Sequence, residues 1–231
     1  MAAHVAERAR RRSIRAVLFD WGDTLFYSPN AADAIIEAAR QRGVEVDRAS
    51  AQRLWEELWR AGKTPQELAK GRDLSPAAHR AVWTALFSRA DAIAPGVGEA
   101  LYERVMDPEA WVPYPDTAPT LRGLKQRGIG VGVVSNVARD IRPAFARHGL
   151  LDLVGTFVLS YEQGAVKPEP RLFLAACAEL GVEPAETLMV GDHPITDGGA
   201  AAAGLRVHLL GLWTPGTPRG LGRILELVDA G

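Results

Sequence analysis

The pattern of apolar and polar positions divides the chain into two kinds of segment. Residues 15 to 20 form a nearly continuous apolar run that ends in Asp20, which is typical of a strand buried on both faces of a parallel sheet. From Pro115 onward, short apolar runs alternate with helical periodicity. We expect strands at 130–134, 156–160, 187–190 and 206–210, and helices at 115–127, 140–148, 168–180, 195–203 and 218–228. This order predicts a right-handed, doubly wound parallel sheet with helices on both faces and the strand 15–20 in its middle.

A second region, between residues 30 and 110, shows helical periodicity and no strand signal. Asn30 and Asp47 are of the type that caps helices, and we expect helices at 30–42, 47–61, 64–70, 75–93 and 97–106. Trp55 and Trp59 stand four residues apart and are expected to pack in the helical core. The predicted parts are a basic N-terminal arm at 1–13, an α/β core at 14–28 and 112–231, and an all-helical insertion at 29–111.

Composition narrows the classes of partner. The chain has 27 basic and 28 acidic residues, so its net charge gives no reason to expect nucleic acid or an anionic membrane as the main partner. The arginines of the N-terminal arm are expected to form a solvated tail. Neither a transmembrane-length apolar run nor a signal peptide is evident, and the single cysteine, Cys177, suits a reducing compartment. We expect a cytoplasmic protein with a small-molecule partner.

Polar side chains gather where the predicted strands end. Asp20 ends the first strand, Ser135 and Asn136 follow the second, Lys167 lies near the third, and Asp192 follows the fourth with Asp197 nearby. Ligands of open parallel sheets bind outside the carboxyl ends of the strands. We therefore expect three carboxylates, a hydroxyl and a lysine to converge on one rim of the sheet.

Such a set of groups favours phosphoryl chemistry. Carboxylates held close together repel one another unless a divalent cation neutralises them, and hard oxygen ligands suit Mg²⁺. Lys167 can keep Asp20 ionised and contact an anionic substrate, and the Ser135 hydroxyl can donate to a phosphoryl oxygen. A carboxylate attacks without prior deprotonation, so the predicted reaction forms an aspartyl-phosphate that is then hydrolysed.

At these residues the chain resembles the haloacid dehalogenase superfamily, over nearly its whole length. Its four signatures occur in the family's order, as Asp20 to Leu25, Val133-Val134-Ser135-Asn136, Lys167-Pro168-Glu169-Pro170, and Gly191-Asp192 through Asp197. The resemblance implies a Rossmann-like core and identifies the helical insertion as a cap of the C1 type, which closes over the site and selects the substrate.

The resemblance also assigns roles. It implies that Asp20 is the nucleophile and that Ser135 and Lys167 bind the phosphoryl group, and Asn136 is a candidate substrate contact. It further implies Mg²⁺ as cofactor, held by Asp20, the backbone carbonyl of Gly22 and Asp192, with Asp197 acting through the metal's water shell.

One position departs from the family pattern. Phosphatases of the family carry a second Asp two residues after the nucleophile, which protonates the leaving group, but this chain has Gly22 there and Asp23 one residue later. A one-residue displacement points a side chain in a different direction, and general acid catalysis requires hydrogen-bond reach. We expect Asp23 to hydrogen-bond locally, and the enzyme to prefer phosphates with good leaving groups or to use an acid supplied by the cap or the substrate.

The same departure leaves other functions open. A 2-haloacid dehalogenase also needs an Asp nucleophile and expels halide without a proton, but the metal-like Asp192 and Asp197 argue against it. A phosphonate-cleaving enzyme of the family needs a cap lysine, for which Lys63 and Lys70 are the candidates. A catalytically impaired ligand-binding module is the non-enzyme alternative. The sequence favours a Mg²⁺-dependent phosphatase of small phosphorylated molecules.

Overall fold

The computed structural model describes residues 13–29, 31–214 and 217–230. Most of the predicted basic arm and the predicted helix cap at Asn30 lie outside these ranges. Within them, no helix is both long and apolar enough to cross a bilayer.

The centre of the fold is a five-stranded parallel sheet in the order β5-β4-β1-β6-β7. Its strands are β1 (Ala16–Phe19), β4 (Gly130–Ser135), β5 (Thr156–Leu159), β6 (Thr187–Gly191) and β7 (Arg206–Leu209). The predicted strands are therefore confirmed to within one residue at each end. β1 pairs with both β4 and β6, which confirms its central position and brings the ends of these three strands side by side.

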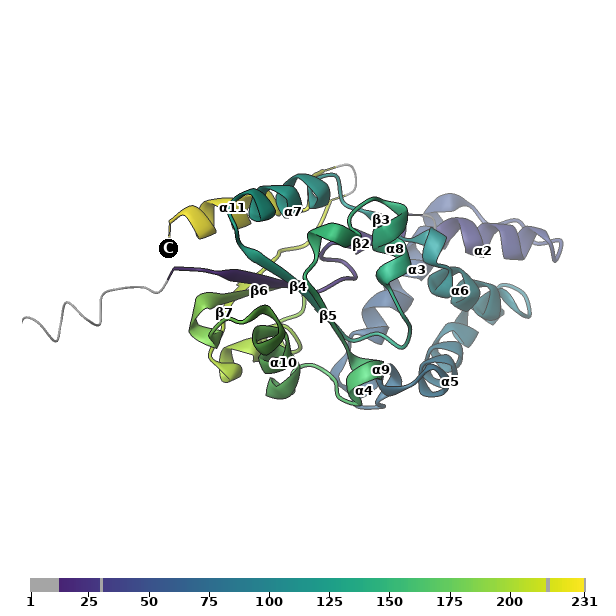
Figure 1. The fold of residues 1–231 in the computed structure, drawn as a ribbon. Coiled ribbons are helices and arrows are strands. Elements are labelled where there is room, and N and C mark those ends of the chain that lie inside the picture. Colours follow the sequence, from purple (N-terminus) through teal and green to yellow (C-terminus); the bar gives the residue numbers. More distant parts are fainter. Residues whose placement is uncertain (1–12, 30, 215–216, 231) are drawn as a thin grey trace, which may run out of the picture.

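Helices cover both faces of this sheet, as predicted (Figure 1). Val17 and Phe19 of β1 belong to the larger apolar cluster, which includes residues of α7 (Thr117–Gln126) and α11 (Gly222–Asp229). Leu18 points to the opposite face and joins the cluster under α10 (Pro170–Leu180). Alternating side chains of a strand face opposite sides of a sheet, so a strand packed on both sides is apolar throughout.

Short elements connect these layers. They are α8 (Arg142–Arg147), η4 (Leu151–Leu153), α9 (Ser160–Gln163), η5 (Pro184–Glu186) and η6 (Gly198–Ala203), where η denotes a 3-10 helix. The helix expected over 195–203 is only this 3-10 segment, and it begins with two glycines, which are poor helix formers. The helix expected from Pro168 begins at Pro170, because a residue that precedes proline is disfavoured in helical conformation. The helix expected from 218 begins at Gly222.

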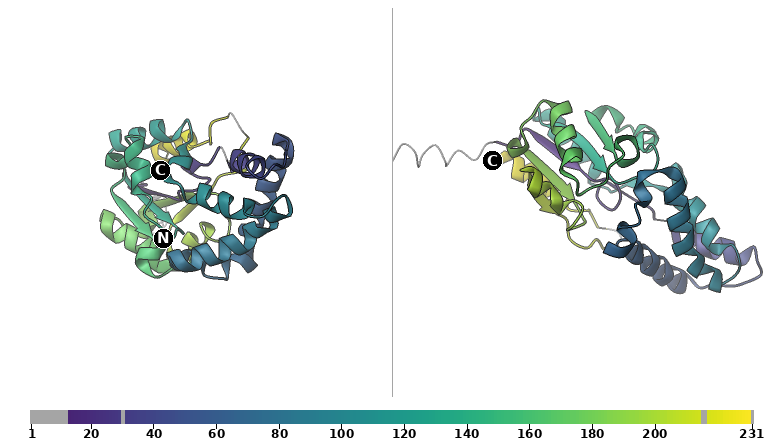
Figure 2. Two further views of the ribbon diagram at one scale, coloured as in Figure 1. Left: turned by 90° about the vertical axis from the view of Figure 1, so that its right-hand side faces the viewer. Right: turned by 90° about the horizontal axis from the view of Figure 1, so that it is seen from below.

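Residues 31–110, which we call the helical segment, form helices and turns only. Its elements are α2 (Ala31–Arg40), α3 (Arg48–Gly62), α4 (Pro65–Leu68), η1 (Arg72–Leu74), α5 (Pro76–Phe87), η2 (Ser88–Ala92), α6 (Val97–Met106) and η3 (Pro108–Ala110). Asp47 caps α3, as predicted, through a hydrogen bond from the Ser50 amide. The segment lies beyond the carboxyl ends of the sheet strands, at one end of an elongated molecule (Figures 1 and 2).

Two very short strands flank the helical segment and were not predicted. β2 (Phe26–Tyr27) and β3 (Val112–Pro113) pair antiparallel. They hold together the two stretches of chain that enter and leave the helical segment. Strands of two residues carry no readable alternation, so the sequence gives no signal for them. The domain boundaries at 28/29 and 111/112 stay a prediction.

Leu18 offers a test of the packing around β1. Leu18→Ala is expected to lower the free energy of unfolding by about 2–5 kcal/mol, because it leaves a cavity in a fully buried position. Urea denaturation measures the change. Leu212→Ala, which truncates a fully exposed leucine, is the control and should leave the unfolding midpoint nearly unchanged. An equal loss in both variants would contradict this account of the core.

Candidate active site

Asp20 lies directly after β1, and one of its carboxylate oxygens collects several donors. Oδ1 accepts hydrogen bonds from the Trp21 amide at 2.8 Å and the Ser135 hydroxyl at 2.7 Å, and lies 2.9 Å from Lys167 Nζ. All the contacts that described residues direct to this carboxylate end on Oδ1. Oδ2 therefore remains available to an incoming ligand, with the orientation of the carboxylate fixed from the other side.

Lys167 sits between two carboxylates in the interior. Its Nζ lies 2.6 Å from Asp197 Oδ1 and 2.9 Å from Asp20 Oδ1, and its side chain is 1% exposed. Burial by itself disfavours the ammonium, but the charges of Asp197 and Asp20 outweigh it and raise the pKa of Lys167 above its ordinary value. The lysine therefore stays protonated and supplies positive charge where the phosphoryl group is expected.

Asp197 is held from both sides. While Oδ1 contacts Lys167, Oδ2 accepts the backbone N–H groups of Asp192 at 3.0 Å and His193 at 2.9 Å. Burial raises its pKa to about 6, against the lowering effect of Lys167. A Cβ at Gly191 would meet Asp197 Cγ at 2.2 Å, so only glycine permits this close approach.

The three predicted carboxylates form a potential metal cluster. Asp20, Asp192 and Asp197 each offer an oxygen, and these oxygens lie within 4.8 Å of one another. Oxygen donors of this kind fit a hard divalent cation. Burial raises the pKa of Asp192, because its charge is disfavoured in the interior and only partly offset by Lys63. The three carboxylates thus suit a metal ion, and a nearby positive charge stabilises their ionised form.

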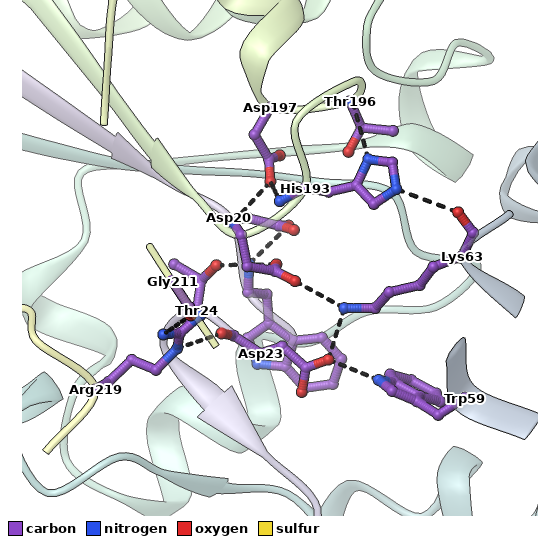
Figure 3. A network of polar contacts seen from close by, with 12 residues as sticks. Asp20, Asp23, Thr24, Trp59, Lys63, His193, Thr196, Asp197, Gly211 and Arg219 are labelled. Carbon is purple, nitrogen blue, oxygen red and sulfur yellow. Dashed lines mark hydrogen bonds and ion pairs between the residues drawn. The ribbon is translucent and has the colours of Figure 1, made fainter. Parts of the chain in front are cut away.

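A lysine of the helical segment forms an ion pair with Asp192. Lys63, just after α3, places its Nζ 2.7 Å from Asp192 Oδ2. The same Nζ lies 2.7 Å from Asp23 Oδ2 (Figure 3). Burial opposes the ammonium, but Asp23 and Asp192 raise the pKa of Lys63 above its ordinary value. A cation that binds Asp192 through Oδ2 has to share or displace Lys63.

Asp23 does not hydrogen-bond locally through its carboxylate, contrary to the expectation. Its Oδ2 accepts the Trp59 indole N–H at 2.6 Å as well as Lys63, both from a distant part of the chain (Figure 3). The backbone explains the direction, since φ is 56° at Asp23 and its carbonyl accepts Arg219 Nε at 2.7 Å. Asp23 therefore ties the core to the helical segment.

Asn136 has a structural partner. Its side chain accepts the backbone N–H of Lys167 at 2.7 Å and donates to the Lys167 carbonyl at 3.1 Å. These two hydrogen bonds fix the loop that carries the lysine, so Asn136 positions Lys167. It also lines the cavity described next.

A cavity of about 130 Å³ lies between the sheet edge and the helical segment. The predicted site residues line it except Asp197, which lies buried behind Lys167. The sequence analysis missed several other residues of the lining: Trp21, Arg72, Asp73, His79, Trp83, Trp111 and Arg139. Trp55 packs in the core as expected, whereas Trp59 reaches the cavity. Lys70 pairs with Glu67 on the surface. Of these, Trp21 follows the end of β1 and Arg139 lies in the loop after β4, so both stand near the strand ends that the sequence predicts.

Charged groups on the wall of the cavity are mostly paired. Arg72 lies 3.4 Å from Asp73, donates to the Gly62 carbonyl and covers the ring of Trp83 at 4.4 Å. Burial raises the pKa of Asp73 to about 6 although Arg72 opposes it. Burial, together with nearby arginines, lowers the pKa of His79 to about 4, so this imidazole is neutral at neutral pH.

The fold and the cavity define an α/β enzyme whose site lies at the carboxyl ends of a doubly wound parallel sheet. A family model of haloacid dehalogenase-like hydrolases matches residues 14–204. A glyceraldehyde 3-phosphate phosphatase of Methanopyrus kandleri is 34% identical over 201 residues, which cover 83% of this chain and 82% of the relative. A ribulose-1,5-bisphosphate 5-phosphatase of Halopiger xanaduensis is 31% identical over 211 residues, 84% of this chain and 83% of the relative. The chain belongs to the haloacid dehalogenase-like hydrolases.

Solved structures agree on the fold. A dehalogenase in an intermediate complex superposes with a TM-score of 0.66 at 23% identity, covering 93% of this chain and 97% of the other. A phosphatase of the family from Thermococcus onnurineus gives a TM-score of 0.59 at 24% identity, with 93% and 98% covered. Phosphatases and dehalogenases thus share this architecture.

Lys167 provides a test of the buried charge cluster. Lys167→Met is expected to lower the free energy of unfolding by about 3–5 kcal/mol at neutral pH, because it leaves Asp20 and Asp197 facing one another without a buried cation. Denaturation of wild type and variant measures the loss. Lys125→Met, at an exposed position on α7, is the matched control. A stability unchanged in Lys167→Met would show that the two carboxylates do not need the ammonium.

Proposed function

We propose that this protein is a Mg²⁺-dependent phosphatase that hydrolyses small phosphorylated molecules through an aspartyl-phosphate on Asp20. The observation that carries the proposal is the Asp20 carboxylate, anchored through Oδ1 by Ser135 and Lys167 while Oδ2 remains available. Two relatives that match most of the chain at 31% identity or more are named phosphatases. These names support a small phosphorylated substrate for this chain as well.

The chain's own groups account for the attack. Asp20 Oδ2 forms the new bond to phosphorus while the bond to the leaving oxygen breaks. Lys167 and Ser135 lie on the same side of the carboxylate and can donate to the phosphoryl oxygens as negative charge develops on them. Asn136 keeps Lys167 in place for this contact.

A divalent cation supplies the remaining positive charge. Asp20, the Gly22 carbonyl and Asp192 are the groups that would hold Mg²⁺, where it would offset the negative charge of the phosphoryl group. We assign Asp197 to the support of Lys167 and of the Asp192 loop, since its oxygens are already bound to these groups. We further propose that the helical segment acts as a cap, because it closes the cavity with Trp59 and Lys63.

The phosphonate-cleaving alternative receives no support from Lys63. A Schiff base requires the neutral amine, whereas two carboxylates raise the pKa of Lys63 and hold it as an ammonium. Lys70 is exposed and does not line the cavity.

A panel assay tests the proposed function. Purified protein with Mg²⁺ is expected to release phosphate from acyl and aryl phosphates, to lose this activity with EDTA, and to lose it in Asp20→Asn, which removes the attacking oxygen. Phosphate release and halide release from 2-haloacids are measured in parallel. Halide release without metal would replace the proposal by a dehalogenase. Mg²⁺ binding without turnover on any substrate would replace it by a ligand-binding module.

The missing acid at Gly22 yields a second test. Because Asp23 is engaged by Trp59 and Lys63, we expect kcat to fall steeply as the pKa of the leaving group rises. A Cβ at Gly22 would meet only the Trp111 ring, at 3.6 Å, which is an ordinary van der Waals contact. Gly22→Asp should therefore raise turnover of alkyl phosphates, by about 10²-fold if the new acid reaches the leaving oxygen.

The control for this variant is Gly22→Asn, which has the same shape and no acidic proton. It should keep the steep dependence on the leaving group. Wild-type turnover that is equally fast for alkyl and aryl phosphates would contradict the inference that the chain lacks a general acid at position 22.

A further inference from the structure

Arg139 lies in the loop after β4 and lines the same cavity as Asp20. Its Nη2 donates to the Val105 carbonyl at 3.0 Å, and its guanidinium lies 5.7 Å from the ring of Trp21. Its Nη1 is buried and has no hydrogen-bond partner within the ranges that the structure describes. A buried donor without a partner is costly, so this atom is a candidate for contact with a ligand.

The charge of Arg139 is also unbalanced. Burial lowers its pKa to about 10, against the opposing effects of Asp107 and Tyr102, so the guanidinium remains charged at neutral pH. Among the described residues, no carboxylate lies within 4.0 Å of it. Asp107, the acidic group that acts on it most, pairs with Arg104 at 3.3 Å. A half-buried cation of this kind gains from an anionic partner.

The other charged groups on the wall do not supply that anion. Asp73 is paired with Arg72, and His79 is neutral at neutral pH because its pKa is lowered to about 4. Among the described residues of the wall, Arg139 therefore keeps a charge with which an anion in the cavity can pair.

Aromatic rings make up much of the cavity wall. Trp21 and Trp111 lie with ring centroids 4.3 Å apart, and Trp59 and Trp83 are stacked at 5.4 Å. All four rings line the cavity. Indole faces favour a compact, largely apolar or planar group over a long polyhydroxylated one.

We propose that Arg139 binds a second anionic group on the leaving-group side of the substrate. This inference rests on the proposed phosphatase function and narrows its substrates to phosphate esters whose alcohol or phenol carries a carboxylate or a second phosphate near a small apolar or planar body. Arg139 Nη1 donates to that anion while Ser135 and Lys167 hold the phosphoryl group. Arg139 is then a specificity-determining residue, because it contacts a part of the substrate that does not react.

Matched substrates test the assignment. We compare phenyl phosphate with carboxyphenyl phosphates, and glycerol 3-phosphate with 3-phosphoglycerate, using wild type and Arg139→Gln. The variant should lose about 10- to 100-fold in kcat/KM on the substrates with a second anion, since a charge-assisted hydrogen bond is lost, and under about 3-fold on their neutral partners. Phenylene bisphosphate compared with carboxyphenyl phosphate shows whether a second phosphate or a carboxylate is the preferred anion.

Two further variants serve as controls. Arg122→Gln, at an exposed position on α7, should leave both classes of substrate unchanged. Arg139→Lys keeps a positive charge and should recover part of the preference. Equal losses of Arg139→Gln on anionic and neutral substrates, or no loss on either, would overturn the proposal, and thermal unfolding of each variant shows whether an equal loss reflects misfolding.

Binding separates this inference from the proposed function. Benzoate and benzyl alcohol are titrated into wild type and Arg139→Gln, with tryptophan fluorescence as the readout because Trp21 lies beside Arg139. Benzoate should bind wild type at least about 10-fold more tightly than the variant, whereas benzyl alcohol should not distinguish them. This result can hold even if no phosphate ester is hydrolysed. Equal affinity of benzoate for both proteins would refute the anion subsite while leaving the phosphatase assay intact.

Discussion

The ion pair of Lys167 with Asp20 and Asp197 is the constraint on which the site depends. Two carboxylates cannot share a buried region without a cation, and Lys167 meets both at 2.9 and 2.6 Å. The arrangement needs β1, β4 and β6 side by side, because they carry Asp20, Ser135 and the loop of Asp197. Asn136 fixes the loop that carries Lys167 through a hydrogen bond to its backbone. Gly191 leaves the space that the Asp197 side chain occupies. The parallel sheet is thus the frame of one charge cluster.

A second set of charges couples the core to the helical segment. Asp23 and Asp192 both bind Lys63, and Asp23 also binds Trp59. The exchange of glycine and aspartate at positions 22 and 23 therefore has a structural consequence, since it aims the carboxylate at α3. The same contact brings an ammonium beside the carboxylates that are proposed to hold the metal. Metal binding and the position of the helical segment are linked through Lys63 on this account.

The cavity has chemically different ends. At the sheet edge, Ser135 and Lys167 surround the Asp20 carboxylate, as a phosphoryl site requires. In the same cavity, beside the ring of Trp21, the half-buried Arg139 has an Nη1 without a partner among the described residues. On the proposals above, Asp20, Ser135 and Lys167 bind the phosphoryl group that all substrates share, and Arg139 binds an anionic group that differs between substrates.

The sequence by itself determined the order of strands and helices, because burial on both faces makes each parallel strand a continuous apolar run. It also identified Asp20, Ser135, Lys167, Asp192 and Asp197, because residues at strand ends share one edge of such a sheet. Only the tertiary structure decided the direction of the Asp23 side chain, which depends on one left-handed backbone angle. It also decided that Trp59 of α3 and Lys63, just after α3, contact this side chain. The role proposed for Arg139 likewise follows only from the tertiary structure, because the packing of distant segments buries its Nη1 without a hydrogen-bond partner among the described residues.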